Sequence, residues 1–382
     1  MLYLDHAATS PVRPEVLEAM RPYLTGVFGN PSSHHTVGEA AAQALEWARG
    51  RVAAALGVRR SEVIFTSGGT EANNLAVKGI VLGAMQFAHE LRGLISTPIE
   101  HESILQSGEY LRRLHGVPVT LLPVDSGGAV SVDDLRAAMS ATPSALLSIG
   151  HANNEIGTVQ SMAELIGAAH AQEVPVHVDA VQSAGWLDLR TLGADAISIA
   201  GHKLGTPKGI GAVAVRSRVP LEPLLHGGGQ ERGRRSGTEN VAGAVGLATA
   251  LDLAESERDQ SVAVIAAQTR TFIASVLDSV PQASLTGSPD HRLPNLASFT
   301  FAGTSGESVL LELERRGVVS SSGSACAAGS DEPSPVLLAT GIAPEVAQTS
   351  VRFTFGRAPL PEGMAQHLAA LVADAVAAAA MP

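Results

Sequence analysis

The sequence predicts an α/β protein with a large domain, built on a mostly parallel sheet covered by helices, and a smaller α+β domain. Short apolar strands alternate with helical segments up to about residue 215, and this alternation is typical of a parallel sheet with helices on both faces. Beyond about residue 260 the pattern changes to one helix followed by shorter, widely spaced strands. We therefore expect the large domain over residues 15–258 and the small domain over residues 1–14 and 259–382.

The first half of the chain alternates between apolar runs of strand length and longer segments with helical spacing. A proline and a glutamate open the first helical segment, as expected of a first turn. The apolar positions between 37 and 56 recur with the period of a helix. We expect strands at 63–65, 94–98, 117–124, 145–149, 174–179 and 212–215, and helices at 14–23, 37–56, 132–139 and 162–172, with another helix that runs through residue 78.

The second half of the chain begins with a loop at 226–240 that is rich in glycine and arginine. An apolar helix at 241–256 is expected to link the two domains, and a further helix is expected to end near residue 280. Strands are expected near 298–301 and 351–355. The alanine-rich tail is interrupted by Asp374, so we interpret it as a packed terminal helix.

The composition excludes several functional classes. The 382 residues are 45% hydrophobic and 16% charged, with a formal charge of −11 and no basic stripe. Direct binding of nucleic acid is not expected, because phosphate contacts need clustered lysine and arginine. We expect neither a secretory signal nor a membrane span, since no charge-free apolar segment reaches roughly 18 residues. Cys326 is the one cysteine, which excludes an intramolecular disulfide and predicts a cytoplasmic location.

Two charged residues follow neighbouring predicted strands. Asp179 ends one strand, and the next strand ends in Ala200-Gly201-His202-Lys203. Parallel strands present ligand groups at their carboxyl ends. Pyridoxal phosphate (PLP) needs a lysine that forms a Schiff base and a carboxylate that pairs with its pyridine nitrogen. These two residues by themselves are also compatible with a solvated loop lysine and a helix-capping aspartate.

A glycine-rich turn, Thr66-Ser67-Gly68-Gly69-Thr70, joins the strand at 63–65 to the following helix. A strand, such a turn and a helix N-terminus together make an anion site, because free backbone N–H groups and the helix dipole converge there. The segment lacks the spacing of a P-loop. An ordinary tight turn with Thr70 as a helix cap is the alternative interpretation.

Motifs of one family are distributed along nearly the whole chain. They read YLDHAATSP, GNPSS, FTSGGTEANNLAVKG, EH at 100–101, NNEIG, HVDAVQSAG, GHKLGTPKGIGA, HGGGQERGRRSGTEN, SSGSACAAGSDEPS and VRFTFGR. In this order they resemble the PLP-dependent cysteine desulfurases of the NifS/IscS type, which belong to the class V aminotransferase superfamily and have fold type I. The resemblance implies a PLP cofactor and no metal.

The resemblance assigns several residues to the cofactor ring. Lys203 is implied to be the Schiff-base lysine, and Asp179 the partner of the pyridine nitrogen. His101 is implied to stack on the ring and to act as an acid or base near the substrate thiol. Asn154 and Gln182 are implied to contact the phenolic oxygen of the ring.

The resemblance also assigns residues to the cofactor phosphate. Gly69 and Thr70 match the phosphate loop, and His202 matches a further phosphate contact. Thr238 matches a residue that reaches the phosphate from a second subunit. A homodimer with shared active sites is therefore implied.

The substrate side is assigned in the same way. Arg352 matches the arginine that holds the substrate carboxylate, and a planar guanidinium suits a carboxylate better than a lysine does. Asn30 lies in the motif that lines the substrate side. Cys326 lies in a polar run, SSGSACAAGS, whereas a lone cysteine is more often a small buried hydrophobe. The resemblance makes Cys326 the catalytic nucleophile.

The implied reaction converts L-cysteine to L-alanine and leaves a persulfide on Cys326, whose sulfur passes to an acceptor protein. Iron–sulfur scaffolds and the thiolation enzymes that modify nucleic acids are candidate acceptors. One alternative is another PLP enzyme of this fold, such as a selenocysteine lyase or an aminotransferase. A second alternative is a non-catalytic scaffold of sulfur assembly.

Ala200 departs from the family pattern. The family usually has serine or threonine at this position, whose hydroxyl binds the cofactor phosphate. Loss of one such hydrogen bond costs roughly 1.5–3 kcal/mol if nothing replaces it. We therefore expect His202, Thr238 and the backbone of Gly69 and Thr70 to hold PLP still, but less tightly than with a hydroxyl at this position.

Overall fold

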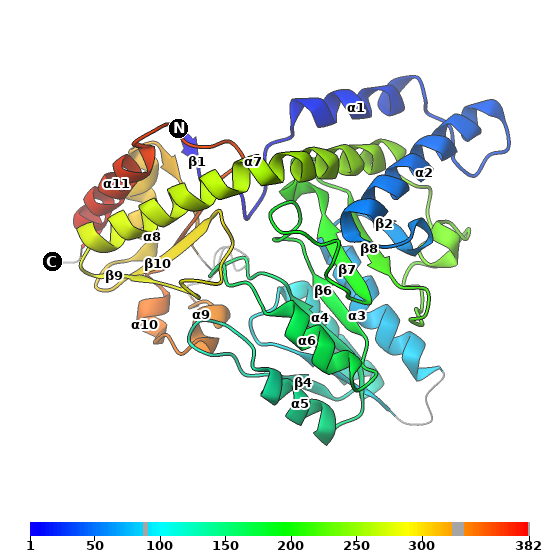
Figure 1. Ribbon diagram of the computed structural model, residues 1–382, viewed down its shortest axis with the longest axis horizontal. Coiled ribbons are helices and arrows are strands. Elements are labelled where there is room, and N and C mark those ends of the chain that lie inside the picture. The colour runs from blue at the N-terminus through cyan, green and yellow to red at the C-terminus, as the bar shows by residue number, and fades with distance from the viewer. Residues whose placement is uncertain (87–90, 323–331, 381–382) are drawn as a thin grey trace.

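The computed structural model describes residues 1–86, 91–322 and 332–380 and confirms the α/β fold (Figure 1). Its central feature is a seven-stranded sheet with the order β2-β8-β7-β6-β5-β3-β4. Strand β8 runs antiparallel to both neighbours, and the remaining pairs are parallel. The strands are β2 (Val63–Thr66), β3 (Gly93–Ser96), β4 (Val119–Leu121), β5 (Ser144–Gly150), β6 (Val176–Asp179), β7 (Ala196–Ala200) and β8 (Gly211–Val215).

Helices cover both faces of this sheet, as the alternation of its apolar side chains requires. Phe65 of β2 packs in a core cluster with α1, α2, α5 and α6, whereas the adjacent Ile64 packs in another cluster with α3 and α4. The helix after the glycine-rich turn runs to Met85, beyond the expected residue 78. The helices are α1 (Pro14–Thr25), α2 (Thr36–Leu56), α3 (Gly69–Met85), α4 (Glu102–His115), α5 (Val132–Ala141) and α6 (Met162–His170).

A second, smaller layer is built from the C-terminal part of the chain and the first few residues. Strands β12 (Val351–Thr354), β10 (Leu296–Phe301) and β9 (Ala283–Leu285) form an antiparallel sheet. Beside it, β1 (Leu2–Tyr3) pairs in parallel with β11 (Val318–Val319). Edge-to-face phenylalanine rings fill its core. The helices of this layer are α8 (Gly306–Arg315), α9 (Pro335–Ala339), α10 (Pro344–Ala347) and α11 (Met364–Ala379).

One helix, α7 (Val241–Ser279), crosses the molecule from the large sheet to the small one (Figure 1). The expected break near residue 256 is wrong: the helix continues for 39 residues. The polar segment around Asp259 lowers the local hydrophobicity, but it contains no proline or glycine that would end a helix. The predicted domain boundary at residue 258 falls inside α7 and stays a prediction.

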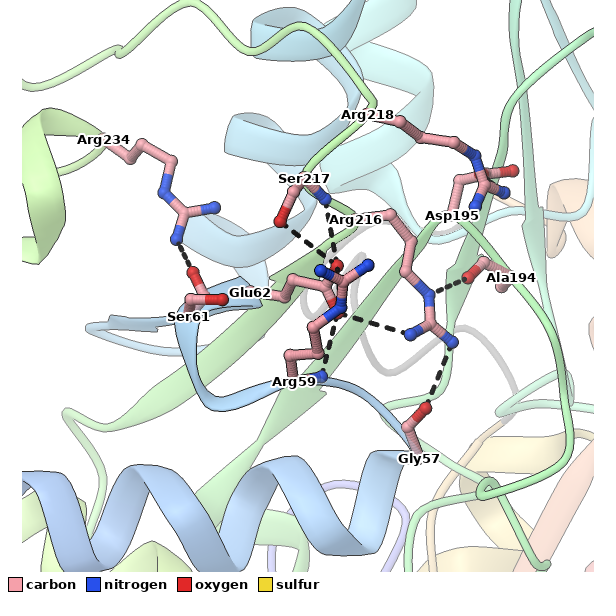
Figure 2. A network of polar contacts seen from close by, with 10 residues as sticks. All are labelled: Gly57, Arg59, Ser61, Glu62, Ala194, Asp195, Arg216, Ser217, Arg218 and Arg234. Carbon is pink, nitrogen blue, oxygen red and sulfur yellow. Dashed lines mark hydrogen bonds and ion pairs between the residues drawn. The ribbon is translucent and has the colours of Figure 1, made fainter.

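A polar network lies at one end of the strands of the central sheet. This end is opposite to the one where Asp179 and Ala200 lie. Figure 2 shows it around Glu62, at the end of η1 (Arg60–Glu62). The buried Glu62 carboxylate accepts hydrogen bonds from the N–H of Arg59 at 2.9 Å and from the N–H of Ser217 at 3.0 Å. Arg216 donates to Glu62 at 3.3 Å and to the Gly57 carbonyl at 3.1 Å. This network holds the start of β2 against the end of β8. Within the described residues, no helix is long and apolar enough to cross a membrane.

Candidate active site

A cavity of about 550 Å³ opens at the carboxyl ends of the parallel strands. Its lining comes from the segments that follow β2, β3, β5, β6 and β7, from the N-terminal arm at Ala7 and Ala8, and from β12. Its volume is in the range typical of small-molecule sites. The cavity brings together most of the predicted site residues, namely Gly69, Thr70, His101, Asn154, Asp179, Gln182, His202, Lys203 and Arg352.

Asp179 ends β6, and two donors fix the direction of its carboxylate. Asn73 Nδ2 donates to Oδ2 at 2.7 Å, and the N–H of Val181 donates to Oδ1 at 2.9 Å. Asn73 lies on α3, and its side chain is buried. The carboxylate therefore lines the cavity in a fixed orientation, as the partner of a ring nitrogen requires.

His101 is the N-cap of α4 and is linked to Asp179 through side chains. Its Nδ1 accepts a hydrogen bond from the N–H of Ser103 at 3.0 Å. The hydroxyl of Ser103 lies 2.8 Å from the same nitrogen and accepts a bond from Asn73 at 2.9 Å. Because Nδ1 accepts a backbone N–H, the neutral ring carries its proton on Nε2. The path from Asp179 to His101 thus runs through Asn73 and Ser103.

Lys203 lies in η2 (Gly201–Lys203), directly after β7. Its ammonium donates to the carbonyl oxygens of Ala7 and Ala8, the second at 2.8 Å. Gln182 Nε2 donates to the Ala7 carbonyl at 3.1 Å. The N-terminal arm therefore holds both the lysine and the glutamine at the cavity.

The start of α3 forms the anion-binding end of the cavity. Gly69 has no space for a side chain, because a Cβ there would lie 2.9 Å from Val181 Cγ2 and 3.2 Å from Ala200 Cβ. The first-turn N–H groups of a helix have no acceptor within the helix and favour an anion. Burial, together with the charges of Lys203 and Lys208, lowers the pKa of His202 to about 4. This imidazole is therefore neutral at pH 7 and can donate one hydrogen bond.

Arg352 lies on β12 and is 2% exposed. Its Nη2 donates to Asp5 Oδ1 at 2.7 Å, and its Nη1 donates to the carbonyl of Asn154 at 2.9 Å. Its Nε is buried and has no hydrogen-bond partner among the described residues. A carboxylate that binds to this guanidinium must share it with Asp5.

Glu100 is a buried carboxyl group in the wall of the same cavity. Burial raises its pKa to about 8, and the negative charge of Asp179 adds to the rise, although a hydrogen bond from Thr97 opposes it. The hydroxyl of Thr97 donates to Glu100 Oε1 at 2.7 Å. Glu100 is therefore mostly protonated at pH 7, so it adds little negative charge beside Asp179.

Three predicted site residues are not placed in this cavity. Asn30 is exposed, and its Oδ1 accepts a hydrogen bond from the N–H of Ser32 at 2.9 Å. Thr238 is exposed on the loop at 226–240 and does not line the cavity of its own chain. Cys326 lies outside the described residues.

Sequence reasoning missed three residues of the site: Asn73, Ser103 and Asp5. A signal was present for Asn73, because it is a polar residue on a helix face that is otherwise buried and apolar. No such signal marks Asp5, because its contact with Arg352 joins residues 347 positions apart. Among the described residues, no cluster of His, Cys, Asp and Glu is arranged to hold a metal ion.

The residues present fit pyridoxal phosphate. A lysine amine, an oriented carboxylate and a helix N-terminus with a neutral histidine line one cavity, and these are the groups that the cofactor's aldehyde, ring nitrogen and phosphate require. Lys203, Asp179 and the turn at Gly69 would hold these three parts. Fold and site together define a PLP-dependent enzyme.

The comparisons with known proteins agree with this class. Residues 2–364 match the model of the family described as aminotransferase class-V, so the chain belongs to that family. The chain is 44% identical over 359 residues to the cysteine desulfurase IscS of Dictyoglomus turgidum, covering 93% of this chain and 89% of the relative. It is 43% identical to an IscS-like cysteine desulfurase of Mycobacterium tuberculosis, covering 93% of this chain and 91% of the relative.

Solved structures give the same result. A NifS-like protein superposes with a TM-score of 0.88 at 33% identity, covering 98% of this chain and 99% of that one. A structure described as SspA in complex with cysteine superposes with a TM-score of 0.81 at 34% identity, covering 94% of this chain and 100% of that one. The resemblance to the NifS/IscS group is confirmed, and with it the dependence on PLP.

Proposed function

We propose that Cys326 carries the sulfur that this cysteine desulfurase removes from L-cysteine. The substrate C–S bond breaks, a bond forms between the substrate sulfur and the Cys326 sulfur, and the carbon product takes up a proton to become L-alanine. L-cysteine and one thiol thus give L-alanine and one persulfide, so no external oxidant is needed. The convergence of Lys203, Asp179 and Arg352 in one cavity supports PLP chemistry on an amino acid, and the choice of Cys326 as the sulfur carrier rests on the family motif SSGSACAAGS.

Bound PLP would supply an electron sink for negative charge at the substrate Cα. Lys203 Nζ would remove the proton from that carbon, and the carbonyls of Ala7 and Ala8 orient this amine. Asp179 would hold the proton on the ring nitrogen, with its carboxylate fixed by Asn73. His101 would act on the substrate thiol through Nε2, which donates a proton when it is protonated and accepts one when it is not.

Arg352 would bind the substrate carboxylate. The bond to Asp5 compensates the charge of this buried guanidinium in the absence of substrate. Asn154 supplies its carbonyl to Arg352, and we assign its side chain, with Gln182, to the phenolic oxygen of the cofactor. Cofactor and substrate groups are thereby assigned to residues of one cavity.

The enzyme would act as a homodimer in the cytoplasm. Thr238 is exposed and does not line the cavity of its own chain, which suits a residue that completes the phosphate site of a partner subunit. Asn30, also exposed, would lie on the substrate side of the assembled site. The persulfide sulfur would pass to a thiol of an acceptor protein, such as an iron–sulfur scaffold or a thiolation enzyme.

The decisive test replaces Cys326 by alanine. The Cys326→Ala enzyme should keep the visible absorbance of bound PLP but form no persulfide and release no alanine from L-cysteine. Absorbance spectra, thiol labelling followed by mass spectrometry, and an alanine assay measure these three properties.

A Lys203→Ala variant serves as the comparison, because it should lose the absorbance of covalently bound cofactor while Cys326 remains present. Alanine release by Cys326→Ala at the parental rate would contradict the role of Cys326 and favour a lyase mechanism, whereas a 2-oxo acid in place of alanine would favour an aminotransferase. A parental protein that releases no alanine would be a scaffold rather than an enzyme.

A further inference from the structure

The residues on both sides of the segment that contains Cys326 are attached to the wall of the cavity. On the N-terminal side, Ser321 forms an isolated β-bridge with Arg352. The N–H of Arg352 donates to the Ser321 carbonyl at 2.7 Å, and the N–H of Ser321 donates to the Arg352 carbonyl at 3.2 Å. The chain therefore enters this segment beside the arginine that lines the cavity.

On the C-terminal side, Ser334 makes a buried hydrogen bond to Glu155. The Ser334 hydroxyl donates to Glu155 Oε2 at 2.5 Å, and both side chains are less than 8% exposed, at 2% and 7%. Burial raises the pKa of Glu155 to about 7, although the bond from Ser334 and the charge of Arg352 oppose this rise. Glu155 directly follows Asn154, whose carbonyl accepts from Arg352.

Apolar contacts support the same attachment. Val336 and Leu337 of α9 pack with Ile99 and Ile156, on the segments that follow β3 and β5, in a cluster separate from the core of the small sheet. The chain after Ser334 is thus held against the walls of the cavity, although it belongs to the C-terminal part of the sequence.

These contacts form a continuous path from Ser321 through Arg352, Asn154 and Glu155 to Ser334. We propose that Glu155 and Ser334 are positioning residues that fix the base of the Cys326 segment beside Arg352, so that the Cys326 thiol meets the sulfur of a substrate bound there. This inference rests on the proposed role of Cys326 as sulfur acceptor.

A helix cap alone does not explain the bond to Glu155. The hydroxyl oxygen of Ser334 accepts from the N–H of Leu337 at 3.3 Å and so caps α9. Ser305 caps α8 in the same way, accepting from the N–H of Ser308 at 3.4 Å. Ser334 additionally uses its proton to bind a carboxyl group from a distant part of the chain. Ser305 is therefore a matched control for the loss of a cap.

The test is a double-mutant cycle on the PLP-loaded enzyme with Ser334→Ala, Glu155→Ala and the combination, beside Ser305→Ala. Rapid mixing with L-cysteine measures two events, namely the change in cofactor absorbance on substrate binding and the formation of persulfide on Cys326. We expect each single variant to slow persulfide formation about tenfold, as for one lost buried hydrogen bond, and the double variant to be no slower. The absorbance change should keep its dependence on cysteine concentration.

Glu155→Gln keeps an acceptor for the Ser334 hydroxyl and should restore persulfide formation to near the parental rate, even if Glu155→Ala folds poorly. Persulfide formation by Ser334→Ala at the same rate as by Ser305→Ala would overturn the inference, and so would additive losses in the double variant. If the parental enzyme forms no persulfide on Cys326, the proposed function fails instead, so the two failures are distinguishable.

Discussion

Ala200 ends β7 and lies 1% exposed at the junction of the sheet with the start of α3. It lines the cavity, and its Cβ lies 3.2 Å from the position that a Cβ of Gly69 would occupy. A serine hydroxyl at this residue would therefore project near the first turn of α3, where an anion is favoured. The absence of a hydroxyl at Ala200 should therefore affect binding of the cofactor phosphate and leave the catalytic groups unchanged.

We expect the Ala200→Ser variant to bind PLP at least about tenfold more tightly than the parental protein does, because an added hydrogen bond to a charged group contributes roughly 1.5–3 kcal/mol. Titration of the apoenzyme with PLP, followed by absorbance, measures this affinity. Ala196→Ser adds the same hydroxyl at the other end of β7, at a residue that is also 1% exposed, and should not change the affinity. Equal affinities of Ala200→Ser and the parental protein would show that other groups already hold the phosphate fully.

Among individual site residues, the sequence was most informative for those that follow strands or lie in a short motif. Asp179, Lys203 and Gly69 could be predicted because strand ends and helix starts converge in a parallel sheet. Asp5 and Ser103 could not, since their roles depend on contacts with residues that are distant in sequence or on a side-chain path. Such contacts leave no periodic signal.

Among the helices and strands, β6 (Val176–Asp179) contains a histidine that is buried in the core. His177 is completely buried between Ser148 and Ser198 of the two adjacent strands, with hydroxyls at 2.9 and 2.8 Å from its ring nitrogens. Burial lowers its pKa from 6.5 to about 3. The unfolded chain therefore binds a proton at this residue at a pH where the folded protein does not.

This difference makes the sheet sensitive to acid. The contribution of neutral His177 is fully present above pH 6.5 and is lost as the pH falls toward 3, at up to about 1.4 kcal/mol per pH unit. We expect His177→Asn to flatten the decline of the unfolding free energy between pH 6.5 and 4.5, whatever its stability at pH 7. Urea denaturation at several pH values measures the slope. His367→Asn changes an exposed histidine of α11 and should leave the slope as it is; an equal slope in His177→Asn would contradict the prediction.

The elements themselves followed the sequence closely where apolar periodicity was strong, as in α2 (Thr36–Leu56) and β10 (Leu296–Phe301). The break expected in α7 did not follow, because a polar stretch without proline or glycine remains helical when both of its ends are packed. Ala254 and Ile265 are buried on either side of that stretch. Tertiary packing, rather than local hydrophobicity, therefore determines that α7 continues through this stretch.

In the whole molecule, α7 is the continuous connection between the two sheets. Its first half packs in the core of the large sheet and its second half in the core of the small one. Val264 lies between these halves and is 43% exposed, so its side chain contributes little to either core. A change at Val264 therefore tests the continuity of the helix more than its packing.

We expect Val264→Pro to lower the unfolding free energy by about 3 kcal/mol or more, because proline removes one helical hydrogen bond and clashes with the preceding turn. The two sheets should then unfold in separate transitions. Trp186 is 8% exposed in the core of the small sheet, whereas Trp47 on α2 is 47% exposed. The change in tryptophan fluorescence should therefore report mainly the small sheet, and its midpoint should differ from that of circular dichroism. Val264→Ala preserves the helix and should unfold in one transition; a single transition in Val264→Pro would show that the sheets are coupled by other contacts.

The β-bridge between Ser321 and Arg352 also sets a radius of delivery. Cys326 follows Ser321 by five positions, and a fully extended chain of that length spans at most about 18 Å. Under the proposed role of Cys326, and while the bridge holds, its backbone would stay within roughly this distance of Ser321, so the sulfur would be handed over near Arg352. We therefore expect that a partner would have to bring its receiving thiol close to the cavity, and that a protein whose thiol lies deeper than this span could bind to the enzyme without receiving sulfur.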